Sequence, residues 1–142
     1  NERFNELKIA EKELDVEYLG GVKLNKFNPD KISNPTVVKR ARHVVTENDR
    51  VLNAKECLLK DDILKFGQLM IESHNSYSKD FDASTIDVDE IVKKSLECGA
   101  LGARLTGGGF GGFTVSLIEE NNFSKWYDTI TKYYPADKIF EV

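Results

Sequence analysis

Apolar residues recur at helical spacing through the first 76 residues, which predicts an α-helical first half. Within residues 1–17, a stretch rich in Glu and Lys, the apolar side chains that fall on one side of a helix are Phe4, Leu7 and Leu14. Gly20 and Gly21 are expected to end this helix. A polar loop then runs to residue 35, so residues 1–35 are predicted to form a helical lead-in.

A helical hairpin is predicted over residues 36–76. Asn34 suits the N-cap of its first helix, because Pro35 then occupies the first helical position. The apolar positions of this long helix are Val37, Ala41, Val44, Val45, Val51, Leu52 and Leu58. Asp61 and Asp62 can cap the second helix. Its apolar positions are Ile63, Phe66, Leu69 and Met70.

The second half of the chain alternates between strand and helix patterns. Strands are expected at residues 81–86, 101–106, 113–118 and 138–142. One helix is predicted from Asp87 to a stop at Gly99, and another after Asn122 with an aromatic stripe. The order strand, helix, strand, strand, helix, strand is the βαββαβ pattern of a ferredoxin-like fold. Residues 81–142 are therefore predicted to be an α+β core, and residues 1–142 a single α+β domain.

Composition narrows the class of protein. The 142 residues are 40% hydrophobic and 31% charged, which suits a folded domain with its own core. With 20 basic against 24 acidic residues there is no positive excess to attract nucleic acid or a membrane surface. The sequence shows neither a long apolar span nor a leader, so a cytoplasmic location is expected. Cys57 and Cys98 are interpreted as reduced thiols, and no metal site is expected.

A glycine-rich loop separates the two central strands. Its five glycines in six residues are Gly107, Gly108, Gly109, Gly111 and Gly112. Because glycine lacks a Cβ, such a run lets backbone N–H groups converge on an anion or lets another segment approach closely. Residues 107, 109 and 112 satisfy G-x-G-x-x-G, but a strand pattern follows, and no lysine closes a P-loop. The loop is predicted to face a ligand or an interface without being either standard phosphate motif.

Few polar side chains are candidates for catalysis or for ligand binding. Arg104 and Thr106 share one face of the strand before the glycines, so both could contact an anion at the loop. Arg104 can equally pair with a surface carboxylate. His43 and His74 lack metal-ligand spacing, and structural hydrogen bonds are expected for both, although a general-base role stays open for His74. These residues alone form no complete catalytic constellation.

Three segments carry a resemblance to a known family. The glycine segment Gly102-Ala103-Arg104-Leu105-Thr106-Gly107-Gly108-Gly109-Phe110-Gly111-Gly112 closely resembles the C-terminal motif of galactokinases, which are GHMP small-molecule kinases. Residues 40–51 (RARHVVTENDRV) resemble the R-x-R-H-V-x-x-E helix of that family, and residues 69–76 (LMIESHNS) resemble its S-H-x-S segment. Phe113 stands where many galactokinases have cysteine, and Tyr77-Ser78 replaces a leucine-arginine pair.

The resemblance implies that the chain is the C-terminal part of a longer two-domain enzyme. The galactose-recognition segment, the G-L-S-S-S phosphate motif and the catalytic aspartate of the family are absent from these 142 residues. Such an enzyme transfers a phosphoryl group from ATP, with Mg²⁺, to the 1-hydroxyl of α-D-galactose. The resemblance places the glycines and Thr106 on the phosphate side of the cleft, with Arg104 as a candidate anion contact. It implies no catalytic residue and no metal ligand in this chain.

The implied partners are the N-terminal domain of the same enzyme, galactose and ATP. The chain alone is expected to be inactive and to bind neither ATP nor Mg²⁺ tightly. Two alternatives stay open: a non-catalytic galactose sensor of the same family, and a stand-alone ferredoxin-like module that binds a small anion at the loop. Replacing Gly109 with valine in the complete enzyme is expected to cut turnover and to leave the isolated domain folded.

Overall fold

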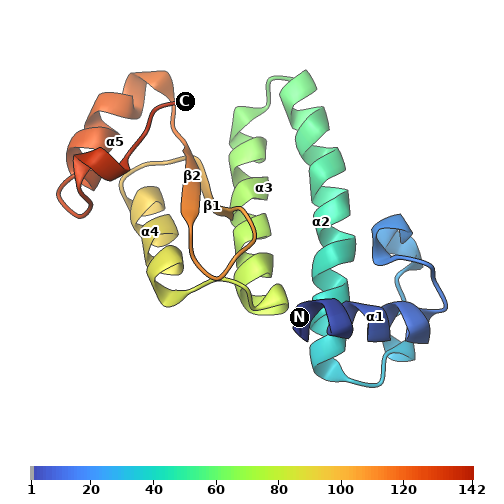
Figure 1. Ribbon diagram of the computed structural model, residues 1–142. Helices are drawn as coiled ribbons and strands as arrows, with labels where there is room; N and C mark the ends of the chain where they lie inside the picture. The colour runs from blue at the N-terminus through green and yellow to red at the C-terminus, as the bar shows by residue number, and fades with distance from the viewer. Residues whose placement is uncertain (1) are drawn as a thin grey trace.

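Residues 2–142, which the computed structural model describes, form five α-helices and one β-hairpin (Figure 1). The helices and strands are α1 (Glu2–Leu14), α2 (Pro35–Leu59), α3 (Ile63–Ser76), α4 (Ile86–Glu97), β1 (Gly102–Thr106), β2 (Phe113–Leu117) and α5 (Phe123–Ile130). A π-helical turn, Tyr77–Phe81, continues α3. The expected α+β fold class is confirmed.

The lead-in packs as a separate cluster on the first half of α2. Helix α1 ends at Leu14, earlier than expected, because Asp15 takes a left-handed conformation with φ 57°. Gly20 and Gly21 therefore lie in a short 3₁₀ turn rather than at the helix end. Figure 1 shows α1 crossing the lower end of α2. The buried residues of this cluster are Ala10, Leu14, Leu19, Ile32, Val37, Ala41 and Val45.

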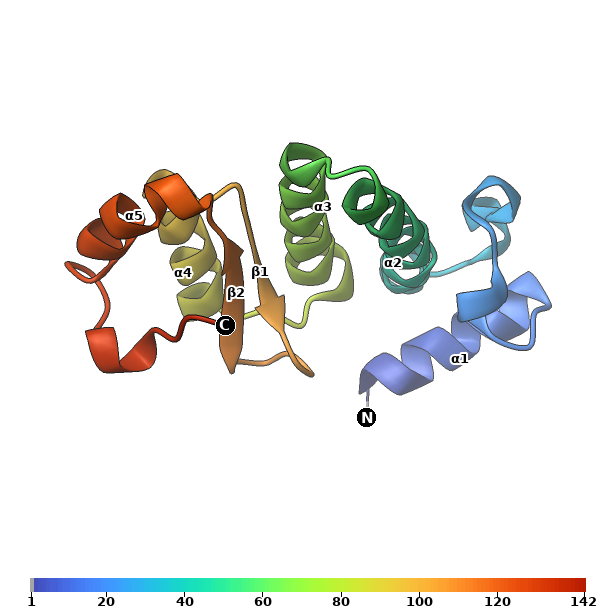
Figure 2. The same ribbon diagram turned by 90° about the horizontal axis from the view of Figure 1, so that it is seen from above.

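The predicted helical hairpin is confirmed, with both of its N-caps. Asn34 Oδ1 accepts the Thr36 N–H at 2.8 Å, and Pro35 occupies the first helical position. Asp62 Oδ1 accepts the Lys65 N–H at 3.1 Å at the start of α3. Helices α2 and α3 run antiparallel and side by side in both views (Figures 1 and 2).

The two central strands are also confirmed, each to within one residue of its predicted ends. They pair antiparallel, from Gly102 opposite Leu117 to Thr106 opposite Phe113. Ala103 and Leu105 are buried beneath the hairpin, while Arg104 belongs to the opposite face. Helix α3 packs on β1, and α4 packs on both strands.

Two of the four expected strands are wrong. Residues 77–81 turn as a π-helix, and α4 begins at Ile86, one residue before the expected start at Asp87, with Thr85 as its N-cap. Near the C-terminus, residues 136–138 form a 3₁₀ turn, and Phe140 stays 69% exposed. A strand needs a neighbouring edge for its hydrogen bonds, and within residues 2–142 the sheet has only β1 and β2. The βαββαβ order is therefore not reached in the described chain.

Helix α5 packs against α4, which itself packs on the hairpin. Asn122 precedes it but makes no side-chain capping bond, contrary to expectation. Of the predicted aromatic stripe, Trp126 is buried beside Ile130, and its Nε1–H donates to the Ser95 carbonyl at 3.1 Å. This bond ties α5 to α4.

Both cysteines, Cys57 and Cys98, are free thiols, as the sequence predicts. No helix within residues 2–142 has the length and apolar character to cross a bilayer.

Candidate functional site

The glycine-rich loop between β1 and β2 needs glycine for its own backbone conformation. Gly107, Gly109, Gly111 and Gly112 have φ of 95°, 87°, 119° and 106°, a region that side chains rarely adopt. Phe110 also lies there, with φ 59°. Among the five loop glycines, Gly108 has no such φ. Most of the glycine run is therefore explained by local geometry, before any ligand is considered.

One side of the loop is attached to the segment that follows α3. The Phe110 N–H donates to the Ala83 carbonyl at 2.6 Å. A Cβ added to Gly109 would lie 2.6 Å from that same carbonyl oxygen and 2.8 Å from Tyr77 Oη. A valine at 109 would therefore collide with this chain's own backbone. The geometry does not support the expectation that a Gly109→Val domain stays folded without strain.

The other side of the loop is open. A Cβ added to Gly107, Gly108 or Gly111 would meet no atom within 4 Å. Phe110 is 64% exposed, and Thr106 is exposed at the end of β1. A ligand or another segment can therefore approach the loop backbone closely from this side.

Arg104 is held beside the hairpin by a carboxylate from α2. Its Nη1 lies 3.2 Å from Glu47 Oε1, and its Nε donates to the Leu105 carbonyl at 3.1 Å. Burial would raise the pKa of Glu47, but hydrogen bonds from Ser73 and Arg50 outweigh burial and lower it. Glu47 is therefore ionised at neutral pH, and the carboxylate pairing expected as an alternative for Arg104 is present.

A groove of about 260 Å³ lies between α2, α3 and β2, beside this ion pair. Its apolar lining residues are Val51, Ala54, Phe66, Leu69, Met70, Val115 and Leu117. None of the loop glycines lines it, so the groove and the loop are separate features.

His74 links α3, α4 and β1. Its Nδ1 accepts the Leu105 N–H at 3.3 Å, and its Nε2 lies 3.2 Å from Asp89 Oδ1. These partners require a neutral ring with the proton on Nε2, and burial lowers the pKa of His74, which favours that form. Asp89 also accepts the Ser78 hydroxyl at 2.7 Å. Because both ring nitrogens are engaged, the structural interpretation of His74 is confirmed.

His43 holds α2 against the end of α3. Its Nδ1 lies 3.0 Å from Ser76 Oγ, and its ring packs on Phe81 and Tyr77 with centroids 4.8 and 5.3 Å apart. Burial lowers the pKa of His43 to about 4, so the ring is neutral at physiological pH. His43 thus contacts the segment from residue 76 onward directly, and His74 reaches it through Asp89 and Ser78; this segment carries the docking carbonyl of Ala83.

Sequence reasoning missed Ala83 and Tyr77 as neighbours of the loop. In the sequence, Tyr77 stands out only as a departure from a family pattern, and Ala83 falls within a predicted strand. The contact between Ala83 and Phe110 uses backbone atoms, which no residue type reveals. A glycine at position 109 is the only feature of the sequence that indicates a close neighbour. It does not show that this neighbour is Ala83.

The side chains of residues 2–142 bring together no group of three or more His, Cys, Asp or Glu suited to a metal ion.

Comparison with known proteins identifies the family. Residues 54–136 match the family described as GHMP kinases C terminal. The chain is 38% identical over 136 residues to galactokinase of Enterococcus faecalis, covering 94% of this chain and 35% of that protein. It is 40% identical over 146 residues to galactokinase of Clostridium acetobutylicum, covering 98% and 37%. The crystal structure of Lactococcus lactis galactokinase complexed with galactose superposes with a TM-score of 0.86 at 34% identity, covering 93% of this chain and 36% of that one.

Fold and loop together place the chain among the C-terminal domains of small-molecule kinases. Because the match covers more than half of its residues, the chain belongs to the GHMP kinase C-terminal family, and the relatives that it matches are galactokinases. It spans about a third of the length of these relatives.

Proposed function

We propose that this chain is the C-terminal part of a galactokinase, which uses ATP to phosphorylate α-D-galactose at the 1-hydroxyl. The superposition on Lactococcus lactis galactokinase, over 93% of this chain with a TM-score of 0.86, is the observation that carries the proposal. That relative was crystallised with galactose, the proposed substrate.

The glycine-rich loop lines the phosphate side of the cleft in this proposal. The proposed site residues are Thr106, Gly107, Gly108, Gly109, Gly111 and Gly112. Backbone N–H groups in such a loop can converge on an anion, and the side that faces away from Ala83 is open at Gly107, Gly108 and Gly111. Phosphoryl transfer depends mainly on positioning and on stabilising charge, so a loop can contribute without a catalytic side chain.

Arg104 has a secondary place in the proposal. It stands on the strand that leads into the loop, but its guanidinium already pairs with Glu47 at 3.2 Å. For Arg104 to contact a phosphate, its ion pair with Glu47 must lengthen, or the guanidinium must bind Glu47 and the phosphate at the same time.

ATP and Mg²⁺ belong to the complete enzyme in this proposal, and the N-terminal domain is the partner that completes the cleft. We assign no Mg²⁺ ligand to this chain, because the resemblance to galactokinases implies none in it. Since ATP is the proposed phosphoryl donor, we place the enzyme in the cytoplasm.

Gly108→Ala in the full-length protein tests the role of the loop. The backbone of Gly108 is not left-handed, and a Cβ there meets no atom within 4 Å, so this domain tolerates the methyl group. If phosphates approach the loop, kcat/KM for ATP falls by roughly tenfold or more, because a misplaced substrate loses much of its rate.

Galactose-dependent release of ADP is the measurement. Gly20→Ala is the matched control, because an added Cβ there meets only ordinary contacts, the nearest 3.4 Å away. A wild-type protein without galactose-dependent ADP release would overturn the proposed function. Unchanged kinetics of Gly108→Ala in an active enzyme would remove only the loop from the site.

A further inference from the structure

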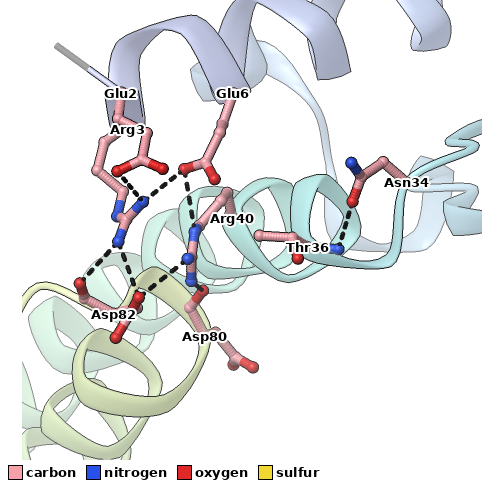
Figure 3. Close-up of polar contacts among 8 residues, drawn as sticks. All are labelled: Glu2, Arg3, Glu6, Asn34, Thr36, Arg40, Asp80 and Asp82. Carbon is pink, nitrogen blue, oxygen red and sulfur yellow. Dashed lines mark hydrogen bonds and ion pairs between the residues drawn. The ribbon is translucent and has the colours of Figure 1, made fainter.

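Arg3 connects the lead-in helix α1 to the segment on which the loop docks. Its Nη2 donates to Asp82 Oδ2 at 2.8 Å and to the Asp82 carbonyl at 3.1 Å (Figure 3). Its Nη1 donates to Glu6 Oε2 at 2.8 Å. The Arg3 and Glu6 side chains are only 12% and 14% exposed, whereas the Asp82 side chain is 66% exposed, so the pair with Glu6 is the better shielded from water.

Arg40, on α2, reaches the same segment from the other side. Its Nη1 donates to the Asp80 carbonyl at 2.6 Å, and its Nη2 donates to Asp82 Oδ2 at 3.1 Å. Its Nε donates to Glu6 Oε2 at 3.1 Å. Glu6 and Asp82 therefore each bridge both arginines, and Figure 3 shows the four side chains converging where α1, α2 and the π-helical turn meet. We call this cluster of Arg3, Glu6, Arg40 and Asp82 the arginine clamp.

The arginine clamp holds main-chain carbonyls as well as carboxylate side chains. Both arginines donate to main-chain carbonyls, those of Asp80 and Asp82. Asp82 lies in the left-handed region with φ 55° and ψ 48°, which turns the chain out of the π-helical turn. Aspartate and asparagine tolerate this conformation better than most side chains.

The residue after Asp82 is Ala83, the docking point of the loop. The Ala83 N–H donates to the Tyr77 carbonyl at 3.3 Å, and its own carbonyl accepts the Phe110 N–H at 2.6 Å. Ala83 is fully buried. The clamp and the loop contact are therefore separated by a single peptide unit, so a shift of Asp82 moves the carbonyl that holds Phe110.

We propose that Arg3 and Arg40 are positioning residues for the glycine-rich loop. They hold residues 80–82 in place, so that the Ala83 carbonyl sets the position of Gly109 and Phe110. The lead-in helix thereby has a function, because it supplies Arg3 and Glu6. The catalytic consequence rests on the proposed function, in which the loop faces the phosphates of ATP.

Arg3→Gln in the full-length protein is the primary variant, because Arg40 is more deeply buried and its loss endangers folding. Lys8→Gln is the matched control, because it removes an ion pair with Glu11 at 2.6 Å on the more exposed side of the same helix. Arg3→Gln is expected to lower kcat/KM for ATP by roughly fivefold or more and Lys8→Gln by less than about twofold. Equal kinetics for wild type and Arg3→Gln would overturn the catalytic consequence.

Asp82→Asn provides a double-mutant cycle, since asparagine keeps the left-handed backbone and removes the charge. If Arg3 acts through the Asp82 carboxylate, the double variant loses no more activity than the worse single variant. Losses that multiply would overturn the route through that carboxylate, because asparagine keeps the main-chain carbonyl to which Arg3 also donates.

Hydrogen exchange of the Phe110 amide tests positioning without an activity assay. In Arg3→Gln this amide is expected to exchange roughly tenfold faster or more, while the amides of α5 keep their wild-type rates. Unchanged exchange at Phe110 would overturn the proposal, as would an equal acceleration in α5, which would mean general destabilisation. This readout holds whether or not the protein phosphorylates galactose, so failure of the proposed function and failure of the clamp are distinguishable.

Discussion

At the scale of single residues, His43 shows how burial couples protonation to folding. The ring is packed against Phe81 and Tyr77, and burial lowers its pKa from 6.5 to about 4. An unfolded chain therefore takes up a proton near pH 6.5, whereas the folded chain resists protonation until about pH 4. The stability that depends on neutral His43 is complete above pH 6.5 and is lost progressively as the pH falls toward 4.

We expect His43 to reduce the free energy of unfolding by about 2 kcal/mol between pH 7 and pH 5. Urea unfolding at the two pH values measures this change. In His43→Asn, the change in the free energy of unfolding between pH 7 and pH 5 should be smaller by that amount. The part of this change that comes from His74, whose pKa burial also lowers, should remain. A variant that loses stability with acid as steeply as the wild type would contradict the assignment.

The loop glycines also differ residue by residue. Gly109→Ala places a Cβ 2.6 Å from the Ala83 carbonyl oxygen at a φ of 87°, so a loss of roughly 2 kcal/mol or more is expected. Gly108→Ala meets open space and should change stability by less than about 1 kcal/mol. Thermal unfolding of the two variants compares them. Equal destabilisation would mean that the loop is not docked on Ala83.

At the scale of elements, α3 and β1 approach each other through two glycines. A Cβ on Gly102 would lie 2.5 Å from the Gly67 carbonyl oxygen, and a Cβ on Gly67 would collide with the Leu101 carbonyl. In the sequence, Gly67 is only a weak helix former within α3. In the structure, it allows the helix to lie directly on the strand.

Gly67→Ala separates these two effects. Helix propensity alone predicts a gain of about 1 kcal/mol, whereas the collision with β1 predicts a net loss of roughly 2 kcal/mol. Gln68→Ala, on the exposed side of the same helix, should be nearly neutral. Urea unfolding gives the sign, and a more stable Gly67→Ala would refute the close approach.

The starts of α2 and α3 were predictable because a local bond sets each of them. The side chains of Asn34 and Asp62 cap α2 and α3 as expected, because a cap needs partners only two or three residues away. The expected strand at residues 81–86 failed because β character needs a partner strand. That segment instead follows the turn held by His43 and the arginine clamp.

At the scale of the whole molecule, one face of the hairpin carries exposed apolar side chains. Phe113 is 68% exposed and Val115 is 38% exposed, opposite the buried Ala103 and Leu105. Exposed apolar surface of this kind is typical of an interaction site. The matched galactokinases are about three times as long as this chain.

The chain produced alone is expected to show no galactose-dependent release of ADP from ATP, because the motifs for galactose and for catalysis are absent from its 142 residues. A coupled ADP assay on the purified chain measures this, with circular dichroism as the control for folding. Galactose-dependent ADP release by the pure chain would contradict the assignment of the chemistry to another domain.

The sequence by itself determined the features that depend on neighbouring residues: the helices, the N-caps of α2 and α3, the hairpin strands and the glycine loop. These follow from side-chain periodicity and from backbone sterics within a few residues. Only the tertiary structure decided that Phe110 docks on Ala83, that Arg3 clamps Asp82 and that Gly67 meets Gly102. Such contacts join residues far apart in the chain, and the packing of the whole core selects them from many pairings that the sequence allows equally.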